Sequence, residues 1–239
     1  MLTNSVIIIL REVLEAAFLI SVFLALGQKL NQSKIWLVSG LSLGIISAIV
    51  YAINIQTVSM AWEGVGQEIL NASIHLILYL GIVLFVVSLK HRDSTHLISW
   101  LMACCVALAI TREGSEIIIY IQGLITIPEM RSPVLIGSFI GAGIGVSIGV
   151  FCYYLIANIS FKNSMNVGLF LLVFIAAGMI LQVTQLLIQA DIIDSQQALW
   201  NSSSFISERS LLGQLLYALI GYEATPTPLQ VYAYVSCLI

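Results

Sequence analysis

Long apolar runs separated by short polar segments dominate this chain. Six runs are long enough to cross a bilayer as a helix, which takes about 20 apolar residues; they cover residues 4–27, 35–56, 69–89, 96–125, 134–158 and 166–190. A further apolar stretch near the C-terminal end is interrupted between Gly221 and Pro228 by glycine, two prolines and Glu223. The pattern predicts an all-α membrane protein with about seven transmembrane helices, the last of them short or broken.

Charged residues are scarce. Apolar residues make up 59% of the chain and charged residues 9%, whereas a soluble globular protein carries about 25% charged residues. The net charge of −3 and the lack of a basic run give no signal for nucleic-acid binding. The first run lacks the basic start and cleavage site of a signal peptide, so we expect it to remain as a helix. The partner that this composition predicts is membrane lipid.

The few basic residues predict how the helices are oriented. Five follow the first, third and fifth runs and two follow the others; the first set is Lys29, Lys34, Lys90, Arg92 and Lys162, and the second is Arg131 and Arg209. Cytoplasmic loops carry the excess of lysine and arginine, so we expect the N-terminus outside and, after seven crossings, the C-terminus in the cytoplasm. The outer loops are then acidic, which either attracts cations or reflects an ordinary solvated surface.

One charged motif, R-E-x-x-E, occurs twice inside apolar runs. Its copies are Arg11-Glu12-Val13-Leu14-Glu15 and Arg112-Glu113-Gly114-Ser115-Glu116. Charges in the hydrocarbon cost at least about 3 kcal/mol each, so they mark functional sites. The motif returns after 101 residues, with three runs in each unit, which predicts a 3+3 inverted repeat as in many secondary transporters. We expect repeats at 1–95 and 96–190, then an outer loop and a short or broken C-terminal helix at 191–239.

The spacing inside each motif predicts a cation site. Two glutamates three apart share a helix face, and each arginine, four before the second glutamate, can pair with it. The four carboxylates and two guanidinium groups sum to −2, so the cluster takes up protons or binds a cation, and oxygen ligands suit hard cations. Buried salt bridges that only fix packing, or a proton relay, remain alternatives. The predicted metal ligands are Glu12, Glu15, Glu113 and Glu116, with Arg11 and Arg112 as their ion-pair partners.

Four other residues are candidates for an outer entry path. Glu68 opens the third run and His75 follows seven residues later, so the two share a helix face. Asp191 and Asp194 lie in the loop after the sixth run. A lone histidine in a span is also typical of a packing residue, so its role stays open.

Glycines recur every fourth residue in the fifth run. They are Gly137, Gly141, Gly145 and Gly149. Such a stripe predicts close packing against a neighbouring helix or subunit.

With these motifs, their spacing and seven candidate spans, the chain resembles the high-affinity, oxidase-dependent iron permeases over nearly its whole length. Further likenesses to that family are Gly66-Gln67-Glu68 at the start of the third run, Leu199-Trp200-Asn201-Ser202-Ser203, Gly213-Gln214-Leu215-Leu216 and Gly221-Tyr222-Glu223.

The resemblance implies inward transport of iron, as Fe³⁺ or Fe²⁺, across a bacterial inner membrane or a plasma membrane. It implies the glutamates of both motifs as ligands and translocation residues, no tightly bound cofactor, and an iron-oxidising partner protein. Two positions depart from the family: Asn71 and Asn201 stand where an acidic residue is usual. Both changes remove a negative charge from positions expected to face outward.

Two other functions stay open. One is transport of another metal cation, such as lead, on the same fold, and the other is a membrane subunit that binds metal without moving it. An enzyme is disfavoured, because a bis-histidine haem protein needs paired histidines in its spans and only His75 lies well inside one. The sequence does not predict an oligomeric state.

Overall fold

The computed structural model describes residues 2–91, 94–208 and 210–238, and this part of the chain is helical, with no strand. The longer helices are α1 (Leu2–Lys29), α2 (Ile35–Ile53), α4 (Gly66–His91), α5 (Thr95–Ile125), α6 (Pro128–Ala157) and α7 (Phe161–Gln189). The shorter elements are α3 (Ile55–Met60), the 3₁₀ turn η1 (Trp62–Gly64), α8 (Leu211–Ile220) and α9 (Pro228–Leu238). The predicted all-α class is therefore confirmed.

Each of the six apolar runs corresponds to one long helix. Five of these helices, α2, α4, α5, α6 and α7, are long and apolar enough to cross a membrane. The remaining one, α1, has 28 residues and carries the first R-E-x-x-E motif in its middle. Its charged side chains therefore need partners inside the bundle.

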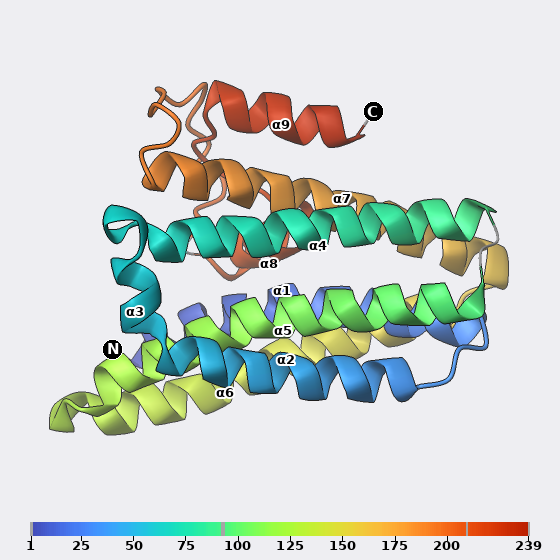
Figure 1. The fold of residues 1–239 in the computed structure, drawn as a ribbon, viewed down its shortest axis with the longest axis horizontal. Helices are drawn as coiled ribbons and strands as arrows, with labels where there is room; N and C mark the ends of the chain where they lie inside the picture. Colours follow the sequence, from blue (N-terminus) through green and yellow to red (C-terminus); the bar gives the residue numbers. More distant parts are fainter. Residues whose placement is uncertain (1, 92–93, 209, 239) are drawn as a thin grey trace.

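The long helices pack in three pairs, of which α1–α6 and α2–α5 are parallel and α4–α7 is antiparallel. In Figure 1, α1 lies beside α6, α2 beside α5 and α4 beside α7. Bonds at one end of the first pair confirm its direction, since Ser21 Oγ donates to the carbonyl of Gly149 at 2.6 Å and Lys29 Nζ to that of Ile159 at 2.9 Å.

The two helices that carry the motifs run in opposite directions. Near one end of α1, Ser5 Oγ is hydrogen-bonded to Tyr120 Oη at 2.8 Å. Near the other, Ser99 Oγ donates to Gln32 Oε1 at 2.6 Å. The start of α1 therefore meets the end of α5, and the two motifs lie at similar depth.

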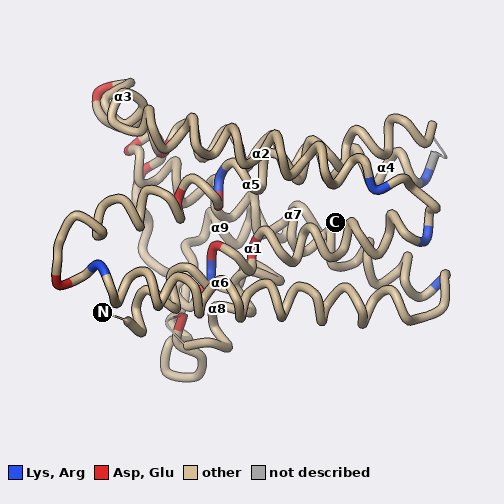
Figure 2. The backbone as a smooth tube through the Cα atoms, turned by 90° about the horizontal axis from the view of Figure 1, so that it is seen from below, with Lys and Arg blue, Asp and Glu red and all other residues tan. Residues whose placement is uncertain are grey.

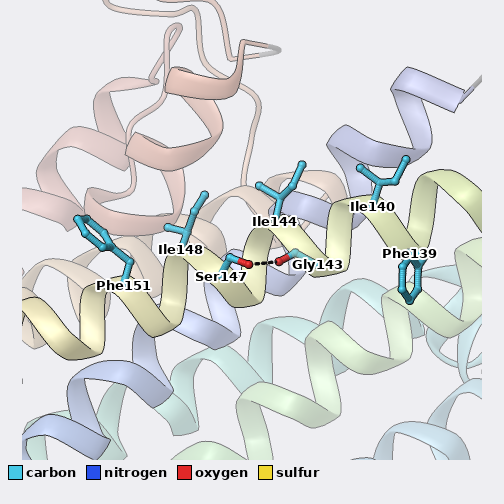
Figure 3. A pocket seen from close by; sticks show the side chains of 7 residues that line it. All are labelled: Phe139, Ile140, Gly143, Ile144, Ser147, Ile148 and Phe151. Carbon is cyan, nitrogen blue, oxygen red and sulfur yellow. Dashed lines mark hydrogen bonds between the residues drawn. The ribbon is translucent and has the colours of Figure 1, made fainter.

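Glycines set the distance between α6 and α1. A Cβ at Gly141 would lie 2.6 Å from the carbonyl oxygen of Val6, and one at Gly137 would lie 2.8 Å from that of Leu2. The stripe predicted from the sequence therefore contacts a neighbouring helix of the same chain. On another face of α6, Phe139 and Phe151 are exposed beside a shallow apolar groove that includes Gly143 (Figure 3).

A second glycine contact joins α2 to α5. A Cβ at Gly40 would lie 2.8 Å from the carbonyl oxygen of Ala103, and one at Gly44 would lie 2.9 Å from that of Ala107. Each motif-bearing helix is thus held at backbone distance by a glycine-containing partner. This close packing fixes the backbone positions from which the motif side chains project.

Charged residues divide the molecule into two ends (Figure 2). Lys29, Lys34, Lys90 and Lys162 lie at helix ends on one side, which we call the basic end. The opposite side, with α3, η1 and the α5–α6 turn, carries Glu63 and Glu129 and is called the acidic end, although Arg131 also lies there. Arg92, Asp93 and Arg209 fall outside the described residues.

The C-terminal part forms two short helices. At about 1.5 Å per residue, the 10 residues of α8 and the 11 of α9 span roughly 15 and 17 Å, about half a hydrocarbon layer. Gly221 ends α8 with φ of 66°, a left-handed conformation that glycine adopts without strain. α8 packs against α1 and α7, and α9 lies on the outer side of α7 (Figure 1). A cytoplasmic C-terminus stays a prediction.

We predict that Gly141→Ala destabilises the protein. The added Cβ would meet backbone atoms of α1, which cannot rotate away, and overpacking of this kind costs about 1–3 kcal/mol. The melting temperature in detergent should fall by about 2–4 °C per kcal/mol.

Gly143→Ala is the matched control, because a Cβ at Gly143 meets nothing within 4 Å. Its melting temperature should equal or slightly exceed that of the wild type. Equal melting temperatures for both variants would contradict the close approach of α6 to α1.

Candidate functional site

The two motifs meet in the middle of the bundle. Glu12 and Glu15 project from α1 and Glu113 and Glu116 from α5; the first three are buried and Glu116 is partly exposed. Within each helix the two glutamates are three residues apart, so they lie on one face. Because α1 and α5 are antiparallel, Glu12 and Glu116 lie nearer the acidic end, and Glu15 and Glu113 lie about one turn deeper.

Arg112 lies among all four carboxylates. Its Nη1 is 3.2 Å from Glu12 Oε2 and 3.6 Å from Glu15 Oε2, and it also donates to Glu113 Oε2. Its Nη2 is 3.1 Å from Glu116 Oε1. With 8% of its side chain exposed, this guanidinium is a nearly dry counter-ion for the cluster.

Arg11 has a different environment. Its Nε is 3.4 Å from Glu15 Oε1, and its guanidinium stacks over the ring of Tyr217 in α8 at 4.1 Å from the centroid. About a third of its side chain is exposed. The two arginines make the predicted pairs with the glutamate four residues on, but only Arg112 contacts both motifs.

Neutral side chains from two other helices complete the cluster. Asn71 of α4 donates from Nδ2 to Glu116 Oε1 at 3.4 Å and accepts from Tyr51 Oη at 3.0 Å. Gln182 of α7 donates from Nε2 to Glu15 Oε2 at 2.8 Å. These amides stabilise carboxylates by hydrogen bonds without adding charge.

Two groups of ligand atoms in the cluster lie close enough to hold a metal ion. One comprises Glu12, Glu113 and Glu116, and the other comprises Glu15, His75 and Glu113. Within each group the ligand atoms lie within 4.8 Å of one another. Glu113 belongs to both groups, so the two groups share one carboxylate.

A polar cavity of about 250 Å³ leads to the cluster from the acidic end. It reaches Arg112 and Glu116 and lies between the start of α4, the end of α7 and α8. Its polar walls include Gln67, Glu68, Asn71, Gln182, Gln185 and Gln189. Such a lining can form hydrogen bonds to water or to a hydrated ion.

Beyond the carboxylates, toward the basic end, the bundle interior is apolar. Phe18, Ile82 and Phe85 are almost completely buried there, and the ring of Phe23 meets that of Phe85 edge to face at 4.9 Å between centroids. The cluster is thus connected to the acidic end by a polar cavity and separated from the basic end by packed side chains.

The predicted entry residues lie in three different places. Glu68 lines the cavity. His75 is buried deeper, beside Glu15 and Glu113. Asp191 and Asp194 lie in the exposed segment after α7 and do not line the cavity.

The two asparagines that stand where the resembled family usually has an acidic residue lie in different places. Asn71 is buried and bonded to Glu116, so it belongs to the site and not to the outer face. Asn201 is exposed in the segment between α7 and α8.

Sequence reasoning missed the contributions of Gln182 and Tyr217. A signal for the glutamine was present, since Gln182, Gln185 and Gln189 follow an i, i+3, i+7 spacing and make a polar stripe on an apolar helix. Tyr217 had no such signal, because its contact with Arg11 depends on how α8 packs against α1. Tyr120, four residues after Glu116 in α5, is hydrogen-bonded to Ser5.

Comparison with known proteins identifies the family. No curated protein and no solved structure matches the chain. Residues 67–238 match the family described as Iron permease FTR1 family. The match includes the second R-E-x-x-E motif, begins at the mouth of the polar cavity and leaves out the first motif. Since it spans well over half of the chain, this multi-pass membrane protein belongs to the Iron permease FTR1 family.

Proposed function

We propose that this permease moves iron inward through the carboxylate cluster formed by its two R-E-x-x-E motifs. The observation that carries the proposal is the position of Arg112, among four glutamates from two antiparallel helices at the inner end of a polar cavity. One guanidinium among four carboxylates leaves an excess of negative charge, which a multivalent cation can neutralise. A salt bridge that serves packing alone needs one carboxylate.

The orientation follows from the charges at the two ends. The basic end faces the cytoplasm and the acidic end faces outward, in agreement with the bias of lysine and arginine. The N-terminus is then outside and the polar cavity is open to the outer side. The described conformation is outward-open, since apolar side chains close the path beneath the cluster.

Iron enters through the cavity past Glu68 and the glutamines. At the cluster, Glu12 and Glu116 meet it first, and it displaces the guanidinium of Arg112 from the carboxylates. Hard oxygen ligands suit Fe³⁺ as well as Fe²⁺. An iron-oxidising partner at the outer face is part of the proposal, as the resemblance of the sequence implied.

The helix pairing supports an inverted repeat. If α1, α2 and α4 correspond to α5, α6 and α7, then α1 beside α6 is the counterpart of α5 beside α2. The pair α4 and α7 is its own counterpart. The second helix of each half, α2 or α6, packs against the first helix of the other half, and the first helices α1 and α5 are antiparallel. A two-fold axis in the membrane plane produces this arrangement. α8 and α9 then follow the second repeat as a broken C-terminal element.

Removal of one carboxylate should abolish transport. We expect Glu113→Gln and Glu12→Gln to reduce uptake of radiolabelled iron in proteoliposomes to near background, because each removes a ligand at nearly constant side-chain volume. Glu129→Gln, at an exposed acidic residue on the same end, is the matched control and should transport like the wild type.

Protein abundance in the membrane should be measured with each variant, and lead should be tested as a competitor of iron. Wild-type uptake by either glutamate variant, at normal abundance, would refute the transport site. Stronger competition by lead than by unlabelled iron would reassign the substrate.

The two arginines should differ in their effect on stability. Arg112→Gln leaves four close carboxylates with no buried counter-ion, and breaking a buried ion pair costs about 3–5 kcal/mol. Arg11→Gln should cost less, because Arg11 is more exposed and pairs with Glu15 alone. The measurement is the melting temperature of each purified variant in detergent. Similar losses for the two variants would show that Arg112 is not the central counter-ion.

Cysteine accessibility should reveal the outward-open state. In a variant without the four native cysteines, Gln185→Cys lies in the cavity and should react with an impermeant maleimide from outside. Ile82→Cys, in the apolar interior, should not react from either side. Ser33→Cys, exposed at the basic end, is the control and should react only from inside. Labelling of Ser33→Cys from outside would reverse the orientation.

A further inference from the structure

His75 is a buried histidine in which only one of the two ring nitrogens makes a hydrogen bond of good geometry. Its side chain is 1% exposed, in the middle of α4. Nδ1 lies 2.9 Å from the carbonyl oxygen of Asn71, one turn earlier in the same helix. Nε2 makes no hydrogen bond of good geometry in the described part of the chain, although the side chain of Gln182 lies close enough to interact with the ring.

The bond to Asn71 fixes the tautomer of the ring. A carbonyl oxygen only accepts hydrogen bonds, so Nδ1 carries the proton and donates it. In the neutral ring Nε2 then has a lone pair and no proton. Metal-binding histidines commonly have this arrangement, with one ring nitrogen donating to a backbone carbonyl and the other bound to the metal.

The ring of His75 lies among other acceptors. Nδ1 or Nε2 of His75 lies within 4.8 Å of a carboxylate oxygen of Glu15 and of one of Glu113. The side-chain oxygen of Gln182, whose amide nitrogen bonds Glu15, is also buried without a partner. Glu15 and Glu113 already share the guanidinium of Arg112, but Nε2 of His75 and Oε1 of Gln182 accept no hydrogen bond, and a cation bound beside them would be stabilised by both. A histidine used only for packing would instead satisfy both ring nitrogens.

The position of His75 along α4 distinguishes it from the outer ligands. It lies one turn further from the acidic end than Asn71, which bonds the outer Glu116. Glu15 and Glu113 are likewise the deeper members of their motifs. His75 therefore belongs to the inner level of the cluster, next to the apolar interior.

We infer that Glu15, His75 and Glu113 form an inner subsite that binds a divalent transition-metal ion, with Nε2 of His75 as a nitrogen ligand. The inference rests on the proposed function and extends it. The outer group of Glu12, Glu113 and Glu116 offers only oxygen, whereas the inner group adds an imidazole. Imidazole favours ions such as Fe²⁺ over Mg²⁺ and Ca²⁺. Glu113, common to both groups, passes the ion from the outer level to the inner one.

The test uses Mn²⁺ as a redox-stable and paramagnetic substitute for Fe²⁺. Purified full-length protein, isolated without a histidine tag, is titrated with Mn²⁺ while the free ion is measured by electron paramagnetic resonance. Pulsed resonance then detects nitrogen bound to the ion. We expect a directly bound nitrogen in the wild type. We also expect an affinity lower by about 10- to 100-fold in His75→Gln, by analogy with the loss of supporting groups at metal sites.

Two further variants make the assignment specific. The chain has three histidines, so His91→Gln/His96→Gln leaves His75 as the only one. Grown with ¹⁵N-histidine, this variant should show a ¹⁵N coupling to Mn²⁺, a result that does not depend on how well His75→Gln folds. His96→Gln alone, at an exposed residue near the basic end, should bind like the wild type.

The outcomes separate this inference from the proposed function. If Mn²⁺ binds without nitrogen coupling and Glu113→Gln abolishes binding, His75 is not a ligand while the carboxylate site stands. If Mn²⁺ does not bind, the inner subsite is wrong, and the iron uptake of Glu113→Gln decides the carboxylate site separately. If Mn²⁺ binds regardless of Glu113, both the inner subsite and the carboxylate site are wrong. Nitrogen coupling that disappears in His75→Gln and persists in His96→Gln supports the inner subsite.

Discussion

The contact between one guanidinium and four carboxylates determines much of this structure. Arg112 draws together glutamates from α1 and α5 that would repel one another without it, and it does so where little water is present to screen them. It is therefore both the counter-ion of the cluster and a link between the two motif-bearing helices. The cluster still carries net negative charge, because this guanidinium only partly neutralises four carboxylates.

The residues around the cluster help to set the positions of its side chains and its net charge. Glycines let α6 approach α1 and α2 approach α5 at backbone distance, so the motif side chains begin from fixed positions. Asn71 and Gln182 supply donors without charge. An aspartate in place of Asn71 would add a fifth negative group beside Glu116, which Arg112 would have to offset. The asparagine therefore makes this site less negative than the family pattern implies.

Much of this arrangement could be predicted from residue spacing. The six apolar runs specified the long helices, and the match of residues 67–238 confirmed the family. The spacing of Glu12 and Glu15 specified which side chains share a face. The different environments of Arg11 and Arg112 could not be predicted, because the two motifs are alike in sequence and the difference comes from Tyr217 on a distant helix. Sequence alone also could not predict that Nε2 of His75 has a lone pair and no proton. The tautomer of the ring depends on the bond between Nδ1 and the carbonyl oxygen of Asn71.

The glycine contacts limit how this molecule can change shape. Helices whose backbones touch along several turns cannot slide without large clashes, so α1 with α6, and α2 with α5, must each move as one block. Where α1 of one block meets α5 of the other, the described residues make no glycine-to-backbone contact of this kind, so this seam is freer to open. Arg112 and the glutamates lie on that seam. If an ion replaced the guanidinium of Arg112, the contact that holds the two blocks together would change. Ion binding and movement of the blocks would then be coupled.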